Sequence, residues 1–72
     1  MSAFAAAVEA AEEAMCVYVA AKAKLIVASG NLKYGYTTAD FDSALAADTA
    51  FNAARASFVA ATAALAAQEP GA

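Results

Sequence analysis

Residues 29–41 of this 72-residue chain read Ser-Gly-Asn-Leu-Lys-Tyr-Gly-Tyr-Thr-Thr-Ala-Asp-Phe, and this stretch decides the fold. Its beginning, Ser29-Gly30-Asn31, is typical of a helix end, with Gly30 expected in the left-handed conformation just after the last turn. Residues 30–36 contain two of the three glycines and two of the three tyrosines of the chain. This composition predicts a connecting loop.

The end of the same stretch predicts the start of a second helix. Thr37 stands three positions before Asp40, which is the spacing of a capping box, here with the shorter acidic side chain. Tyr36 before the cap and Phe41 four positions into the helix have the spacing of a hydrophobic staple. No glycine or proline follows before Pro70-Gly71, so a helix is expected from residue 38 to about residue 68.

The residues before the loop predict an equally long first helix. Ser2 can cap a helix that runs from about residue 3 to residue 29. Alanine fills 26 of the 72 positions, and it is the strongest helix former because its side chain loses no rotamer entropy. The sequence therefore predicts one all-α domain over residues 1–72, a two-helix antiparallel hairpin that is part of an oligomeric helical bundle.

Seven-residue periodicity predicts the residues that face each other across the hairpin. The expected seam follows positions 4, 8, 11, 15, 18, 22 and 25 in the first helix and 41, 44, 48, 51, 55, 58, 62 and 65 in the second. The main apolar stripe expected in the first helix holds Phe4, Val8, Met15, Val19 and Ile26, with Tyr18 and Leu25 at its flank.

Four charged residues fall on or near this seam. Folding the hairpin makes residues level when their numbers add to roughly 67–70, so Lys22 lies level with Asp48, and Arg55 with Glu12 or Met15. Our main interpretation is that these residues form two register-setting ion pairs. Contacts with another subunit and a ligand site are the alternatives.

The second helix has more apolar surface than one partner helix can cover. One stripe of large side chains, Phe51, Phe58 and Leu65, lies about 100° around the helix from Phe41, Leu45 and Val59. The residues on the back of the helix are small and nearly all uncharged. Small residues let a neighbouring helix approach closely. In the loop, Tyr34 with Leu32 and Lys33 is either a contact patch or an unused tip. The expected protein interface is therefore Ala46, Ala50, Ala53, Ser57, Ala60, Ala64, Phe51, Phe58, Leu65 and Tyr34.

Charge and hydropathy exclude several kinds of partner. The net charge is −3 and no Lys/Arg cluster exists, so nucleic-acid binding is not expected. The longest uncharged run, residues 56–68, is shorter than the roughly 20 apolar residues of a membrane span, and no membrane span is expected. No basic residue precedes the apolar N-terminal stretch, as a signal peptide would require. We expect a virion or cytoplasmic location.

The residues that carry chemistry are scarce. The chain has no histidine, no tryptophan, no glycine-rich phosphate loop and no nucleophile motif, so no enzyme activity, catalytic residue, cofactor or metal is expected. Glu9, Glu12 and Glu13 could suggest metal ligands, but a solvated helix surface is the favoured interpretation. Cys16, between Met15 and Val17, is interpreted as a small core residue rather than a reactive thiol.

A chain of this length with so many apolar residues has a thin stability margin without a partner. We therefore expect a non-enzymatic structural or assembly subunit that packs through small-residue helix faces. Its partner would be itself, as a homo-oligomer, or a larger particle, such as a virus or phage capsid that it serves as an accessory protein. The alternative is a small acidic helical regulator or inhibitor that docks on a partner protein.

Overall fold

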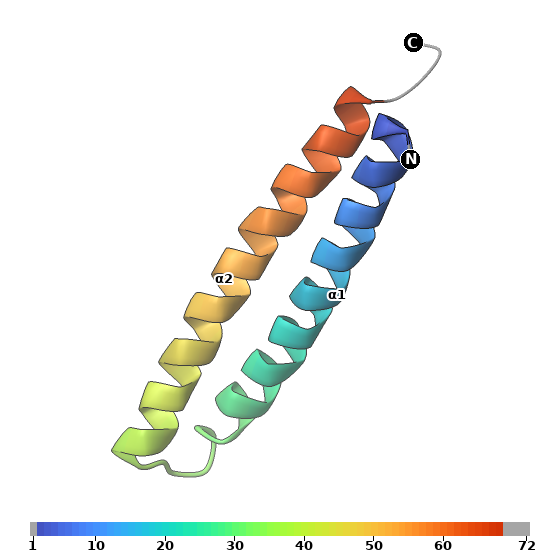
Figure 1. Ribbon diagram of the computed structural model, residues 1–72. Coiled ribbons are helices and arrows are strands. Elements are labelled where there is room, and N and C mark those ends of the chain that lie inside the picture. Colours follow the sequence, from blue (N-terminus) through green and yellow to red (C-terminus); the bar gives the residue numbers. More distant parts are fainter. Residues whose placement is uncertain (1, 69–72) are drawn as a thin grey trace.

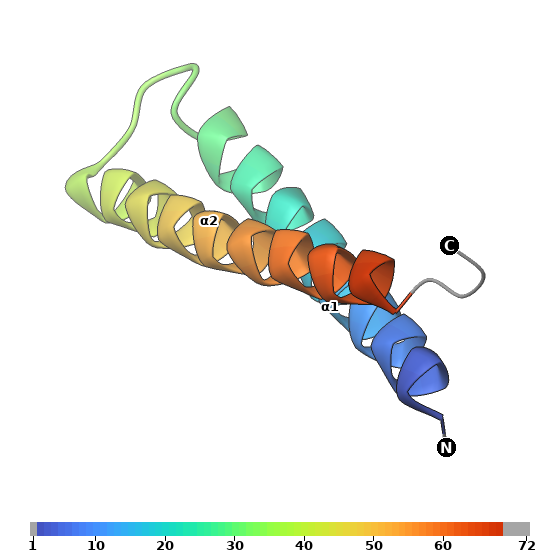
Figure 2. The same ribbon diagram turned by 90° about the horizontal axis from the view of Figure 1, so that it is seen from above.

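The computed structural model describes residues 2–68 and shows two helices, α1 (Ala3–Gly30) and α2 (Thr38–Ala67). They run antiparallel along one another, with the loop at one end of the molecule (Figure 1). Seen from above, the helix axes cross obliquely (Figure 2). The body is slender, 55 × 15 × 14 Å. The predicted all-α hairpin is confirmed, with helix ends within one residue of expectation, while the predicted stop at Pro70-Gly71 lies outside the described residues.

Side-chain caps define the N-termini of both helices, as the sequence predicts. The Ser2 hydroxyl accepts a hydrogen bond from the Ala5 N–H at 3.1 Å. At the start of α2, the Thr37 N–H donates to Asp40 Oδ2 at 3.0 Å, and the Asp40 N–H donates to Thr37 Oγ1 at 3.2 Å. Each cap satisfies backbone donors that have no partner inside the helix, so both helix starts are determined locally.

The predicted hydrophobic staple before α2 is also present. The rings of Tyr36 and Phe41 stack with centroids 6.1 Å apart. This contact holds Phe41 beside the loop, where its side chain stays exposed, and places Asp40 rather than Phe41 on the half-buried side of the first turn. The staple therefore fixes how the chain enters α2.

The end of α1 differs from the prediction. Gly30 is the last residue of α1, and Asn31 after it is still in the right-handed region. The Leu32 N–H then donates to the Ser29 carbonyl at 3.1 Å, which tightens the last turn. Among the described residues the only positive φ, +103°, belongs to Gly35. The left-handed glycine is therefore Gly35, because the last carbonyls of α1 are satisfied without a left-handed residue.

The seam between the helices is partly shifted from the predicted one. Predicted positions 8, 11, 18 and 25 of α1 and 44, 51, 58, 62 and 65 of α2 are buried or half-buried, but at 15, 22, 41, 48 and 55 the residue one position earlier takes the place at the seam. Met15, Lys22, Asp48 and Arg55 are consequently exposed. The residues that line the seam are Ala7, Ala11, Ala14, Tyr18, Ala21, Leu25 and Ala28 of α1, with Ala44, Ala47, Phe51, Ala54, Phe58, Ala61 and Leu65 of α2.

The centre of the seam is one aromatic stack. The ring of Tyr18 lies 5.3 Å from that of Phe51 and 5.5 Å from that of Phe58, between centroids. Ala54, midway between the two phenylalanines on the same face of α2, is only 6% exposed. Aromatic pairs of this geometry stabilise by about 0.5–1.5 kcal/mol each beyond the area they bury. Rows of alanine on both sides of the stack complete the seam.

Much apolar surface lies outside the seam. The expected main stripe of α1 was wrong, because Met15, Val19 and Ile26 are exposed while Tyr18 and Leu25 face α2. The surface area is 5,090 Å², against about 4,100 Å² for a compact monomer of this mass. The surface area is large because one helix can cover only one stripe of its neighbour. The hairpin therefore leaves a second stripe of each helix uncovered.

Candidate interaction faces

The first side of the hairpin is a face of small residues. A groove of about 300 Å³ runs between the helices here, lined by Val17, Ala20, Ala21, Lys24, Ala47 and Ala50. Small, exposed side chains continue from Ala50 along α2 in both directions. We call this surface the small-residue face and define it as Val17, Ala20 and Lys24 of α1 with Ala46, Ala50, Ala53, Ser57, Ala60 and Ala64 of α2.

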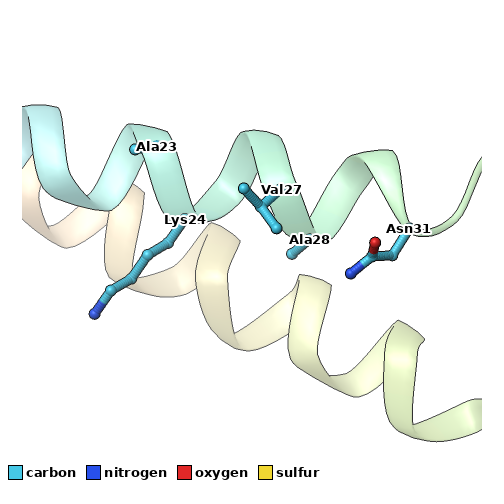
Figure 3. Close-up of a pocket in the computed structure, with 5 residues that line it drawn as sticks. All are labelled: Ala23, Lys24, Val27, Ala28 and Asn31. Atoms are coloured by element: carbon cyan, nitrogen blue, oxygen red, sulfur yellow. The ribbon is translucent and has the colours of Figure 1, made fainter.

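A shallow depression extends this side of α1 towards the loop. It has a volume of about 360 Å³ and is lined by Ala23, Lys24, Val27, Ala28 and Asn31. The Lys24 side chain extends away from Val27 and Asn31, so the polar ends of the lining do not converge (Figure 3). Small-molecule sites usually enclose their ligand and direct several polar groups at it. This depression has the character of an open surface.

The opposite side of the hairpin mixes large apolar side chains with charges. On the first side, Val17 and Ala50 line the groove, and each comes directly before a residue of the seam. Lys22 and Arg55 each follow a residue of the seam by four positions, which places them on the other flank of their helices. We call this surface the mixed face and define it as Val8, Glu12, Met15, Val19, Lys22 and Ile26 of α1 with Phe41, Leu45, Asp48, Asn52, Arg55 and Val59 of α2.

The four residues of the expected ion pairs all belong to the mixed face. Glu12, Lys22, Asp48 and Arg55 are exposed, and within residues 2–68 the structure records no ion pair among them. Asp48 Oδ2 instead accepts a hydrogen bond from Asn52 Nδ2, one turn along the same helix, at 3.3 Å. The fold brings the four charges to one side of the molecule, and their role in setting the register stays a prediction.

The expected interface residues divide between the seam and the surface. Phe51, Phe58 and Leu65 are half-buried against α1, so their partner in this structure is the other helix of the same chain. Tyr34 in the loop is 95% exposed. The six expected small residues, all exposed, are Ala46, Ala50, Ala53, Ser57, Ala60 and Ala64.

Two polar features of α1 have no counterpart that would make a reactive site. Cys16 is a free, exposed thiol, which corrects its interpretation as a core residue, because the side of α1 that carries it points away from α2. Glu9, Glu12 and Glu13 are exposed as well. Within the described part of the chain, no group of three His, Cys, Asp or Glu side chains is placed to hold a metal ion.

By length and composition, α2 is apolar enough to cross a membrane. Its most apolar 18-residue window has a mean hydropathy of 1.2, and only 6% of that window is buried in the hairpin. A single helix of this kind is a weak indication, because core helices of soluble proteins and signal sequences have the same composition. The expectation that the chain has no membrane span stays a prediction.

Comparison with known proteins offers no relative from which a function could be transferred. No family, no curated protein and no solved structure matches this chain. A functional conclusion therefore has to come from the two faces and from the small core that they flank.

Proposed function

We propose that this protein is a non-enzymatic assembly subunit, a helical hairpin that packs through its exposed faces against other copies or a larger protein assembly. One observation carries the proposal: among the described residues, only three are buried, and all three are alanines. Eleven large apolar side chains are exposed in the same molecule. Soluble monomers seldom expose apolar surface on this scale unless it is used for binding.

Covering the exposed apolar side chains would also stabilise the hairpin. Fully burying a large apolar side chain stabilises by about 1.5–3 kcal/mol, so covering the remaining half of one such side chain is worth about 1 kcal/mol. Several of these contacts together approach the total of about 5–15 kcal/mol that stabilises a small protein. Association would therefore contribute a large part of the stability of the folded hairpin.

The small-residue face is the surface on which we place the contact with a neighbouring helix. Alanine and serine let helix axes approach near the lower end of the usual 8–10 Å. A solvated helix normally carries charges on its outer side, whereas the small-residue face contributes none from α2. We propose that helices of the larger assembly pack here.

A repeating particle is the setting that we propose for such a subunit, with a virus or phage capsid as the specific hypothesis. Particles of this kind hold many copies of a small chain close together, so weak contacts through a narrow face are occupied. On this proposal the protein resides in the virion or, before assembly, in the cytoplasm.

Light scattering coupled to size exclusion tests the proposal. At micromolar concentration we expect a mass of more than one chain together with strong helical circular dichroism. A stable, well-folded monomer would overturn the proposal. Ala53→Glu and Ala60→Glu should each weaken association without lowering helicity. Ala63→Glu is the matched control, because it makes the same change at an exposed alanine of α2 outside both faces.

A further inference from the structure

We propose that the mixed face binds the mixed face of a second copy of this chain. The resulting dimer is two-fold symmetric and antiparallel, with α1 lying over α1 of the second copy and α2 over α2. This inference rests on the proposed function, because it names the partner of one of the two exposed faces. The mixed face would bind a second copy, while the small-residue face would remain free for other helices of the assembly.

Charged and apolar side chains along α1 are arranged symmetrically about one point. Residue 17 lies midway between Glu12 and Lys22. A two-fold axis at this level turns each helix end for end over its copy, so each charge meets the opposite charge. The three pairs that the axis creates are Glu12 with Lys22, Met15 with Val19, and Val8 with Ile26. Val8 is half-buried and the other five residues are exposed, so this flank of α1 is complementary to itself.

The same pattern occurs independently in α2. The midpoint between Asp48 and Arg55 lies between residues 51 and 52, and Leu45 and Val59 are spaced evenly about residue 52. The same end-for-end overlay places Asp48 against Arg55 of the second copy and Leu45 against its Val59. Opposite charges face each other again, and aliphatic side chains meet aliphatic side chains.

The tertiary structure brings the two centres to one level. Tyr18, next to the centre of the α1 pattern, stacks on Phe51, next to the centre of the α2 pattern, and also on Phe58, with ring centroids 5.3 and 5.5 Å apart. The two centres therefore lie within about one helical turn of each other. A single two-fold axis can therefore satisfy both helices at once. The other possible two-fold axis, along the helices, would instead lay α1 over α2 of the second copy and bring Lys22 near Asp48, so the charge-exchange variants have to distinguish the two orientations.

The size of the mixed face suits a second copy. A 30-residue helix is about 45 Å long, and the hairpin is 15 Å wide. The footprint is then about 700 Å², close to the roughly 800 Å² that each partner buries in a stable complex. A lipid surface suits this face less well, because its charges lie at the middle of the patch rather than at its edges, and hydrocarbon excludes them.

Paired valine substitutions in an Ala53→Glu background test the dimer, since that change blocks the small-residue face. Val19 on the mixed face is 58% exposed and Val17 on the small-residue face is 54% exposed, so lysine at either position changes the isolated hairpin to the same degree. In sedimentation equilibrium, Val19→Lys should raise the dissociation constant at least a hundredfold. Val17→Lys should leave it within about threefold of the background.

Charge exchange tests the orientation. Lys22→Glu should weaken dimerisation about tenfold, because the two-fold axis repeats each lost pair. The double variant Glu12→Lys/Lys22→Glu should restore it, since the exchanged charges still meet across the axis. In an arrangement of α1 over α2 of the second copy, the double variant would instead face Asp48 and Arg55 with like charges and bind more weakly. That result would overturn the proposed dimer.

The remaining outcomes separate this inference from the proposed function. A wild-type protein that associates, combined with a folded monomer of Ala53→Glu, would overturn the dimer and leave the proposed function standing. A folded wild-type monomer would overturn both. Binding of the wild-type protein to neutral phosphatidylcholine vesicles that is lost in Val19→Lys would assign the mixed face to lipid and overturn the dimer. If Val19→Lys also loses helicity, the charge-exchange pair decides the question.

Discussion

The seam and the mixed face are two stripes of the same pair of helices, and the hairpin closes on the one with less aliphatic surface. The seam alternates large side chains with alanines, so that Tyr18 stacks between Phe51 and Phe58. The mixed face alternates aliphatic side chains with charges, and Lys22 and Asp48 remain exposed there. Close approach of the helix backbones requires small residues at regular intervals. Shape complementarity, rather than hydrophobicity, therefore decides which stripe is buried.

The difference between the two stripes also explains why the core is small. Because alanine buries little area, the rows that allow the helices to approach contribute little energy themselves. The aromatic stack therefore has to supply most of the stability of the isolated hairpin. The mixed face, which could bury more apolar area, points outward. This division predicts unequal effects when equivalent side chains are removed from the two stripes.

The largest expected effect is the loss of the stack. Tyr18→Ala should destabilise the hairpin by about 2–4 kcal/mol, because it removes both aromatic contacts and leaves a cavity between the helices. Met15→Ala, on the mixed face of the same helix, should change the stability of dilute protein by less than about 1 kcal/mol. Urea denaturation followed by circular dichroism measures both. Equal decreases in the free energy of unfolding would show that the seam does not contribute more stability than the mixed face.

An intermediate effect is expected from overfilling the seam. Ala54→Leu should destabilise by about 1–3 kcal/mol, because a larger side chain at the most buried position forces the helices apart beneath the Tyr18 ring. Ala56→Leu is the matched control, since it makes the same change at an exposed alanine of α2 outside both faces. Thermal unfolding of the two variants at equal concentration provides the comparison. A stable Ala54→Leu would mean that the alanine row does not set the helix spacing.

The smallest expected effect concerns local structure, which both stripes share. Thr37→Ala should cost about 1 kcal/mol, because it removes the hydroxyl that accepts from the Asp40 N–H. The control is Thr38→Ala, the first residue inside α2, which leaves the capping box intact. Denaturation curves should shift for the first variant and stay nearly unchanged for the second. A larger shift for Thr38→Ala would contradict the assignment of Thr37 as the cap.

Features set by neighbours in sequence were predictable, and features set by packing were only partly so. The capping box, the staple and both helix ranges depend on contacts within five residues, and each was predicted from residue spacing. The left-handed glycine was misplaced, because a tightened turn after Gly30 satisfies the helix end and moves the left-handed residue to Gly35. Cys16 was assigned to the core from its neighbours in sequence, although its side of α1 points outward.

For the candidate faces, the sequence indicated that α2 has two apolar stripes and that one partner helix cannot cover both. It could not show which stripe of α1 would meet α2. Counting apolar residues favoured Met15, Val19 and Ile26, since alanine carries little weight in such a count. The structure instead uses the alanine rows, because the distance between two helices is limited by their smallest facing residues.

The amino-acid sequence by itself determined two long helices, their caps and the loop between them, because these features depend on local hydrogen bonds and on the helix propensity of alanine. Only the tertiary structure decided that Ala14 and Ala21 rather than Met15 and Lys22 line the seam, and that Lys22, Asp48, Glu12 and Arg55 share one open side. The physical reason is that these relations depend on how two surfaces fit together, and fit is a property of the pair of helices rather than of either one.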